Sequence, residues 1–211
     1  MAKLYYRYSA MNSGKSTMAI QVAHNYEEQG GKILVWKSSI DTKGGDTITS
    51  RVGINRKVDK LLVPTASPKK VLKEEMKQMG TIDAIIIDEA QFLTEMQVNE
   101  IYEISKMEDI PVLCYGLRCD FKMMPFPGSS RLLAIADTIE EIKNICKCKS
   151  KATQNLRLVN GIPTFEGGQV AIDGENKVTY ESVCGKCYLK YYQEWKEKQK
   201  KESWLSWKKK Y

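Results

Sequence analysis

The chain has 211 residues, of which 42% are hydrophobic and 28% charged, and its formal net charge is +7. This length suits one domain, or one domain and a small appendage, with enough apolar residues for a hydrophobic core. No apolar run reaches the length of a bilayer span, and the N-terminus lacks a signal-peptide pattern. We therefore expect a cytoplasmic protein without a membrane partner, whose six cysteines are reduced or metal-bound.

An aromatic-rich apolar run near the N-terminus predicts a first strand, and a near-complete phosphate-binding loop follows it. The pattern Gly-x-x-x-x-Gly-Lys-Ser/Thr is matched at Gly14, Lys15 and Ser16, whereas Ser9 replaces the first glycine. In this pattern the glycine lets the backbone wrap around phosphate, the lysine reaches the β and γ phosphates, and the hydroxyl binds Mg²⁺. The next residues predict a helix whose N-terminus faces the anion. Ser9 leaves a purely structural loop as the alternative, because serine lacks the freedom of glycine at positive φ.

Strands and helices alternate through the following hundred or so residues. Hydrophobic patterning and capping signals predict strands at residues 32–36, 61–63, 83–88 and 110–116, helices at residues 67–79 and 94–107, and a long polar loop at residues 41–56. This alternation is typical of an α/β fold with a mainly parallel sheet and helices on both faces. In such sheets, ligands bind at the carboxyl ends of the strands.

The predicted strand at residues 83–88 ends in two acids, Asp88 and Glu89. An aspartate at this place in phosphate-loop proteins helps to hold Mg²⁺, and the neighbouring glutamate can act as a general base beside the γ-phosphate. The alternative is a strand that ends in a solvated turn. The phosphate-binding loop upstream favours the first interpretation.

Four cysteines form two close pairs, Cys146 with Cys148 and Cys184 with Cys187. Two such pairs, separated by a segment with turn signals, are typical of a zinc ribbon, in which four thiolates close a tetrahedral structural site. Free thiols or disulfides are the alternative, and a cytosolic chain favours zinc. Helical periodicity is expected to stop after Cys146. We predict a phosphate-loop α/β domain at residues 1–143, a small zinc-ribbon domain at 144–192 and a tail at 193–211.

The C-terminal end is strongly basic. From Tyr188 onward there are eight lysines and three glutamates, so five of the seven net positive charges lie there. A solvated, partly helical end is the simpler interpretation, and binding of nucleic acid or an acidic membrane is the alternative. This end also contains three tryptophans, Trp195, Trp204 and Trp207, to which we assign no role.

Together these motifs resemble the cytosolic, zinc-containing thymidine kinases, and the resemblance runs from Leu4 to about Lys190. The segments that carry it are residues 13–17, 40–42, 88–92, 116–117, 120–121, 125–126 and 182–187. It implies a RecA-like phosphate-loop domain and a zinc-ribbon domain whose loop, the lasso, grips the base. It also implies phosphate transfer from ATP to the 5′-hydroxyl of thymidine and deoxyuridine, yielding dTMP for nucleotide salvage and DNA synthesis, in a homotetramer that dTTP inhibits.

The resemblance also implies residue roles. Glu89 is implied as the base that takes the 5′-hydroxyl proton. The ATP and Mg²⁺ site is implied at Ser9, Ala10, Met11, Asn12, Ser13, Gly14, Lys15, Ser16, Asp88 and Gln91. The nucleoside site is implied at Met11, Asp41, Phe92, Leu117, Phe121, Phe126, Val170, Ala171, Ile172 and Tyr180. Structural Zn²⁺ is implied at Cys146, Cys148, Cys184 and Cys187.

Two other classes of protein fit parts of the sequence. A nucleic-acid-dependent ATPase would share residues 88–91 and use the basic tail, but the chain is short for paired motor domains and the rest of it carries only two net positive charges. We therefore expect no stable nucleic-acid partner. A zinc-stabilised phosphate-loop protein that binds without catalysis is the other alternative.

Overall fold

The computed structural model describes residues 1–41, 45–170 and 177–210. It divides into two compact units. The first unit comprises residues 1–118 and 125–142, and the second comprises residues 119–124 and the chain from Lys143 onward.

A six-stranded sheet forms the centre of the first unit, and all of its strand pairs are parallel. In spatial order its strands are β5 (Lys60–Leu62), β2 (Ile33–Ser38), β6 (Ala84–Asp88), β7 (Val112–Leu117), β1 (Leu4–Ser9) and β8 (Thr138–Glu141). The predicted mainly parallel sheet is therefore confirmed. Strand β8 and helix α4 (Pro127–Ile135) are additions that the sequence patterning did not predict.

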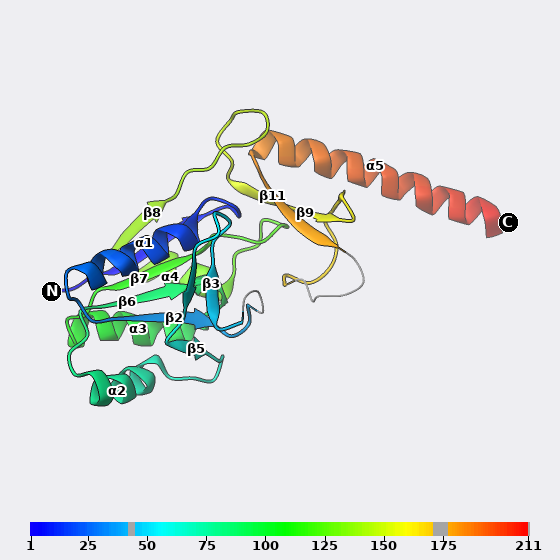
Figure 1. Ribbon diagram of the computed structural model, residues 1–211. Helices are drawn as coiled ribbons and strands as arrows, with labels where there is room; N and C mark the ends of the chain where they lie inside the picture. Colours follow the sequence, from blue (N-terminus) through cyan, green and yellow to red (C-terminus); the bar gives the residue numbers. More distant parts are fainter. Residues whose placement is uncertain (42–44, 171–176, 211) are drawn as a thin grey trace. The chain divides into compact units, whose positions relative to one another are not determined.

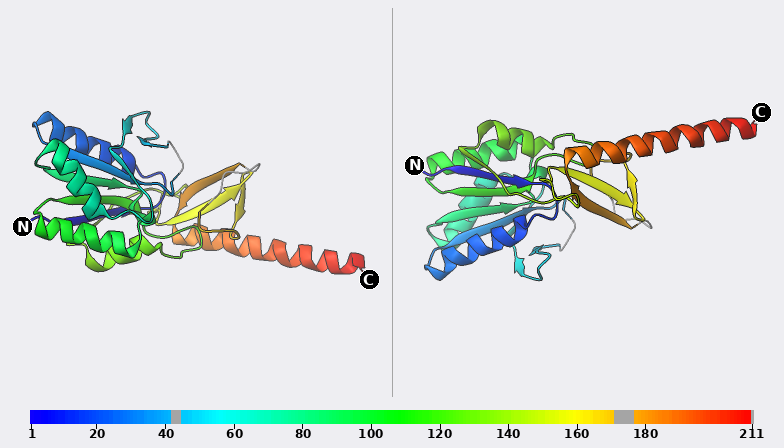
Figure 2. Two further views of the ribbon diagram at one scale, coloured as in Figure 1. Left: turned by 90° about the horizontal axis from the view of Figure 1, so that it is seen from below. Right: turned by 90° about the horizontal axis from the view of Figure 1, so that it is seen from above.

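Helices cover both faces of this sheet (Figures 1 and 2). Helix α1 (Lys15–Glu28) packs on one face, and α2 (Pro68–Met79), α3 (Glu95–Met107) and α4 pack on the other. Side chains along each strand alternate between the two faces: on β2, Val35 joins the core under α1 and Trp36 the core under α2 and α3. Because both faces are buried, the central strands are continuously hydrophobic.

The starts of two helices follow the capping signals in the sequence. The Ser67 hydroxyl accepts a hydrogen bond from the backbone N–H of Lys70, and Pro68 occupies the first turn of α2. Thr94 and Gln97 form a reciprocal capping box at the start of α3. Each cap satisfies backbone N–H groups that have no partner within the helix, which contributes about 1 kcal/mol.

The segment predicted as a long loop at residues 41–56 contains a short hairpin instead. Strands β3 (Thr47–Thr49) and β4 (Asn55–Lys57) pair in antiparallel register, with Ile48 opposite Arg56. Ile48 of β3 and Val58, the residue after β4, are buried in the core beneath α1. Tertiary packing of these two side chains therefore stabilises strands that are too short and too polar to be recognised by pattern.

The second unit is a three-stranded antiparallel sheet with a long helix. The sheet has the order β10 (Ile162–Thr164), β9 (Gln154–Val159) and β11 (Val178–Val183), and α5 spans Gly185–Lys210. The first turns of α5 pack Tyr188, Tyr192 and Trp195 around the ring of Phe165. The expectation that helical periodicity stops after Cys146 does not hold for α5, since these aromatic residues recur at helical spacing, whereas the expected partly helical C-terminal end lies within this helix.

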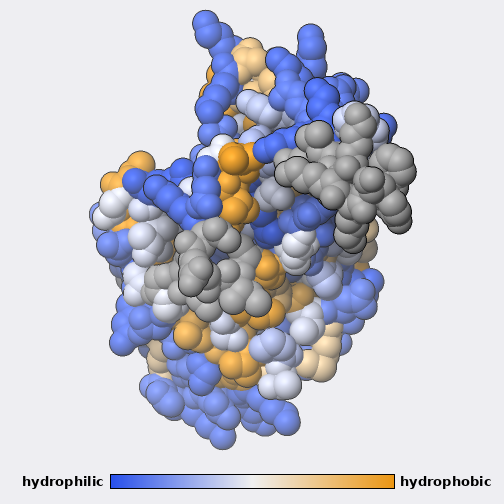
Figure 3. Space-filling model, turned by 90° about the vertical axis from the view of Figure 1, so that its right-hand side faces the viewer, coloured by the Kyte–Doolittle hydropathy of each residue, from blue (hydrophilic) through white to orange (hydrophobic). Residues whose placement is uncertain are grey.

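Hydrophilic side chains cover much of the face shown in Figure 3, and hydrophobic ones appear in smaller patches. None of the helices in the described residues combines the length and the apolar character needed to cross a bilayer.

Candidate functional site

The phosphate-binding loop connects the end of β1 to the first residue of α1. Asn12 and Gly14 adopt left-handed backbone conformations, with φ of 63° and 83°. Left-handed residues within such a loop turn successive backbone N–H groups toward one concavity, which is an anion-binding geometry. Ser9 ends β1 in strand conformation, and its hydroxyl donates to the Ala10 carbonyl at 2.8 Å. The missing glycine therefore causes no strain at this position.

Lys15 is buried within the loop. Its Nζ donates to Ser9 Oγ at 3.2 Å and to the Ala10 carbonyl at 3.1 Å. Burial lowers the pKa of this ammonium, while the negative charges of Glu89 and Asp88 oppose that shift. An anion bound in the loop would add compensating charge to a cation that is now held by neutral oxygens.

Asp88, at the end of β6, lies against the start of α1. Its Oδ2 accepts a hydrogen bond from Ser16 Oγ at 3.0 Å, and its Oδ1 is buried with no hydrogen-bond partner among the residues described. Burial raises the pKa of this carboxyl group. A hydroxyl and a carboxylate with an unused oxygen are the hard oxygen ligands that Mg²⁺ prefers, so these two residues fit the implied cation.

Glu89 has a left-handed backbone, with φ of 53°, and its half-buried side chain accepts a hydrogen bond from Gln91 Nε2. Burial, together with the adjacent negative charge of Asp88, raises the pKa of Glu89 to about 7. A non-glycine residue in this conformation costs about 1–3 kcal/mol and is concentrated at functional sites. The Glu89 side chain beside Asp88 is therefore held in a set position.

The turn after Glu89, η1 (Ala90–Phe92), is fixed by its neighbours. Gln91 is fully buried, and its Oε1 accepts from the backbone N–H of Leu117 at 3.0 Å. A Cβ on Gly116 would lie 2.8 Å from that same Oε1, so β7 approaches the turn closely only because it carries glycine there. The Gln91 side chain therefore connects the Glu89 carboxylate to the backbone of β7 through two hydrogen bonds. Its implied nucleotide contact stays a prediction.

These residues open onto one cavity of about 590 Å³ within the first unit, called the phosphate cavity below. It is lined by residues 11–17, Asp88, Glu89 and Leu117, by Lys37 and Asp41, and by residues 48–52. The structure therefore brings Glu89 together with most of the predicted ATP and Mg²⁺ residues and with Asp41.

Lys37 and residues 48–52 are cavity residues that the sequence patterning missed. Lys37 is buried on β2, and its Nζ forms an ion pair with Asp41 at 2.8 Å. A lysine within an otherwise apolar strand is the signal that could have identified it, because a buried cation requires a partner. Residues 48–52 reach the cavity through the β3–β4 hairpin, which no sequence pattern predicted.

The predicted nucleoside residues fall in both units. In the first unit, Phe92 and Phe126 meet edge to face, with ring centroids 5.4 Å apart. In the second unit, the Arg157 guanidinium lies 3.7 Å from the centroid of the Phe121 ring, and its Nε donates to the Tyr180 hydroxyl at 2.9 Å. Arg157 was not predicted, although it orients two predicted residues.

The remaining predicted nucleoside residues are Val170, Ala171 and Ile172, which precede β11 in the sequence. Val170 is exposed, and the carbonyl of the preceding Gln169 accepts from Arg157 Nη2 at 3.3 Å. Thr42, Ala171 and Ile172, which the resemblance also involves, lie outside the described residues.

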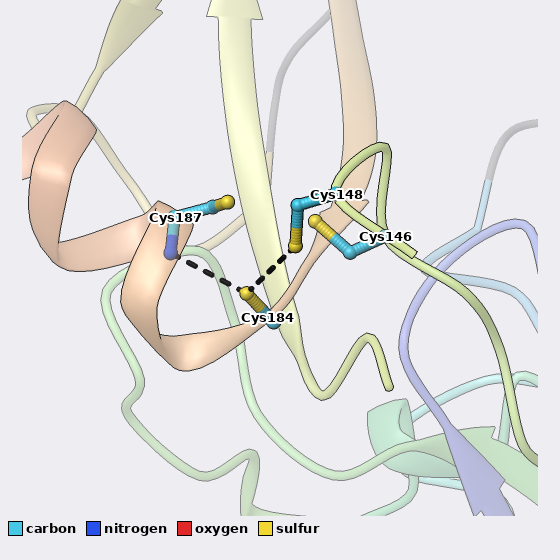
Figure 4. Close-up of side chains that lie close together, drawn as sticks. All are labelled: Cys146, Cys148, Cys184 and Cys187. Atoms are coloured by element: carbon cyan, nitrogen blue, oxygen red, sulfur yellow. Dashed lines mark hydrogen bonds between the residues drawn. The ribbon is translucent and has the colours of Figure 1, made fainter. Parts of the chain in front are cut away.

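The four paired cysteines converge in the second unit (Figure 4). Their Sγ atoms all lie within 4.8 Å of one another, and those of Cys148 and Cys184 are 3.5 Å apart. A tetrahedral zinc site with Zn–S bonds of about 2.3 Å requires sulfur atoms about 3.8 Å apart, so the cluster fits that ion. Hydrogen bonds, first of all with Ser150, lower the pKa of the exposed Cys148 thiol to about 6, whereas hydrogen bonds with the other three cysteines raise the pKa of Cys187 to about 12. Thiolates are the form that binds zinc.

The parallel sheet, the loop at Gly14–Lys15 and the paired Asp88 and Ser16 define a phosphate-loop nucleotide-binding protein of the α/β class, here with a four-cysteine site. The family model described as thymidine kinase matches residues 2–188. The chain therefore belongs to the thymidine kinase family.

Individual relatives carry the same name. The thymidine kinase of Chromobacterium violaceum is 43% identical over 190 residues, which cover 89% of this chain and 98% of the relative. That of Idiomarina loihiensis is 45% identical over 188 residues, covering 88% and 95%. That of Streptococcus pyogenes serotype M3 is 40% identical over 191 residues, covering 90% and 98%.

One solved structure, the Pif1 helicase from Candida albicans, matches 68% of this chain and 36% of that chain at 17% identity and a TM-score of 0.41. A similarity of this size has no bearing on function.

Proposed function

We propose that the chain transfers the γ-phosphate of ATP to the 5′-hydroxyl of thymidine, and of deoxyuridine, to give the 5′-monophosphate. The observation that carries the proposal is the placement of Glu89, Lys15 and the Asp88–Ser16 pair around one cavity. Phosphoryl transfer requires positioning and charge stabilisation more than covalent chemistry, and these groups supply both. Family membership supports thymidine as the acceptor.

Glu89 is proposed as the general base. Its carboxylate takes the proton of the 5′-hydroxyl while an oxygen lone pair forms the bond to the γ-phosphorus. The bond from that phosphorus to the β–γ bridging oxygen breaks, and its electron pair leaves with ADP. The hydrogen bond from Gln91 orients the Glu89 carboxylate during this transfer.

Lys15, Ser16 and Asp88 bind the phosphate end of ATP in this proposal. Lys15 moves its ammonium from Ser9 and Ala10 to the phosphate oxygens, and the backbone N–H groups of the loop add further donors. Ser16 and Asp88 would hold Mg²⁺, which when bound neutralises charge on the β and γ phosphates.

Recognition of the thymine base is assigned to the aromatic residues that the family resemblance indicates. Phe92 and Phe126 present a rigid edge-to-face pair in the first unit. In the second unit, the Arg157 guanidinium lies over the rings of both Phe121 and Tyr180, and it also donates a hydrogen bond to the Tyr180 hydroxyl. Zinc at the four cysteines would tie the ends of the segment that carries Tyr180. Inhibition by dTTP and a homotetrameric, cytoplasmic enzyme belong to the same proposal.

The test is nucleoside-dependent ATP consumption by the full chain with Mg²⁺. Thymidine, deoxyuridine, deoxycytidine, deoxyadenosine and single-stranded DNA would be compared as the second component. We expect turnover with thymidine and deoxyuridine, suppressed by dTTP. Turnover stimulated only by DNA would contradict the proposal and indicate a nucleic-acid-dependent ATPase, and no turnover with any of them would indicate a binding protein.

A further inference from the structure

Arg51 lies at the turn of the β3–β4 hairpin and lines the phosphate cavity together with Lys15, Asp88 and Glu89. The Ser50 carbonyl accepts from the Gly53 N–H at 3.1 Å, and the Ser50 N–H donates to the Ile54 carbonyl at 2.9 Å. Gly53 has a φ of 86°, which a residue with a side chain rarely adopts. The turn therefore has a set geometry, and it carries Arg51 at the cavity wall.

The hairpin itself is anchored to the rest of the first unit. Ile48 is buried beneath α1, and Arg56 forms a forked ion pair with Glu27 of α1, both N–O distances being 2.8 Å. The buried Lys37 also donates to the carbonyls of Gly45 at 3.3 Å and Thr47 at 3.4 Å. The position of the turn relative to the phosphate-binding loop is thus fixed by contacts on both sides of the hairpin.

The cations of this cavity are not equivalent. Lys37 forms an ion pair with Asp41, and Lys15 is held by the oxygens of Ser9 and Ala10. Arg51 has no hydrogen bond or ion pair with any residue that the structure describes, and its side chain is exposed. Arg51 and Lys15 both line the phosphate cavity, so the two cations face a common space. Cations at the wall of one cavity raise the local concentration of anions there, which favours a bound anionic group within reach of both.

We propose that Arg51 is a catalytic residue that contacts the γ-phosphate of ATP. A planar guanidinium donates two parallel hydrogen bonds to a phosphate, which a lysine ammonium cannot do. During transfer, negative charge grows on the γ-phosphoryl oxygens and on the β–γ bridging oxygen, whose bond to phosphorus breaks as the acceptor oxygen bonds. Arg51 stabilises that charge, while the acceptor proton goes to Glu89.

This inference rests on the proposed function for the acceptor, but its test does not. Binding of ADP and of the non-hydrolysable analogue β,γ-imido-ATP, each with Mg²⁺ and without nucleoside, would be measured by calorimetry for the unaltered chain and for Arg51→Gln. Because the two nucleotides differ by the γ-phosphate, their affinity ratio reports contacts to that group alone. A second variant, Arg51→Lys, keeps the charge and loses the forked donor.

We expect Arg51→Gln to weaken binding of the imido analogue about tenfold or more, with ADP binding changed less than about twofold. Turnover with thymidine should fall by about 10² to 10³. Lys57→Gln, which removes an exposed cation from the same hairpin, should change neither quantity. Arg51→Lys should recover part of the analogue affinity.

Equal losses for ADP and the analogue, or no loss for either, would overturn the assignment of Arg51 even if thymidine is phosphorylated normally. Conversely, a selective loss of analogue affinity in a chain that fails to phosphorylate thymidine would support Arg51 and overturn only the proposed acceptor. Circular dichroism of each variant establishes that the fold is retained.

Discussion

At the scale of single residues, the role of Glu89 is open to direct test by Glu89→Gln. The change removes the proton acceptor while keeping size and hydrogen-bonding capacity next to Gln91. We expect kcat to fall by about 10² to 10⁴, the usual contribution of a general base, with little change in the affinity for the imido analogue of ATP. Steady-state kinetics with thymidine and calorimetry with the analogue measure the two effects.

The matched control is Glu95→Gln, which makes the same change at an exposed position in the first turn of α3. It should leave kcat within about twofold, because it lies outside the phosphate cavity and surface substitutions have small effects. A kcat for Glu89→Gln equal to that of the control would rule out the general-base role.

Single residues also show what a sequence can predict. Gly14, Lys15, Asp88 and Glu89 were predicted because each belongs to a short motif next to a hydrophobic run, and they lie together in the structure. Arg51 could not be predicted in this way. It reaches the same cavity through the packing of a hairpin against α1, and such non-local contacts leave no periodic pattern in the chain.

At the scale of elements, the packing of α4 on η1 depends on Gly128. A Cβ at this position would lie 2.6, 2.7 and 2.9 Å from the carbonyl oxygens of Ala90, Leu93 and Gln91. Those oxygens belong to the backbone of the turn that follows Glu89, so they cannot move aside at low cost. Gly128→Ala should therefore displace α4 from the turn and destabilise the protein by about 1–3 kcal/mol.

Urea denaturation measures this loss, and the displaced turn should also lower kcat, since η1 carries the Gln91 that orients Glu89. The control is Gly185→Ala in the first turn of α5, where a Cβ would meet no atom within 4 Å. It should leave stability and kcat near their original values. Unaltered stability in Gly128→Ala would show that α4 and the turn adjust more easily than the close contacts indicate.

Elements differ in how far the sequence predicts them. Helices α2 and α3 were predicted within about a residue at each end because Ser67 and Thr94 are strong capping residues that act locally. The β3–β4 hairpin was not predicted, and α5 was anticipated only as a partly helical C-terminal end, without its bounds. Each of them depends on a few side chains that pack against distant parts of their own unit: Ile48 in the hairpin, and Tyr188 and the partly buried Trp195 in the helix.

At the scale of the whole molecule, the second unit has a small hydrophobic core that includes two of its four clustered cysteines, Cys146 and Cys184. A core of this size stabilises a fold weakly, and zinc bound at the cluster would supply the missing free energy. If zinc occupies the cluster, the chain as it stands should contain one ion, and replacing the exposed thiol in Cys148→Ser should lower that content. It should also make residues after Lys143 sensitive to limited proteolysis.

Because the described residues that line the phosphate cavity belong to the first unit, loss of zinc should leave binding of the imido analogue of ATP unchanged. The KM for thymidine should rise, since Phe121 and Tyr180 belong to the destabilised unit. Cys114→Ala, which removes a buried thiol from the core of the first unit, serves as the control and should retain full zinc content. Elemental analysis, proteolysis and kinetics on the same preparations separate these effects. Full zinc content in Cys148→Ser, or unchanged proteolysis in verifiably zinc-free protein, would show that the second unit folds without the metal.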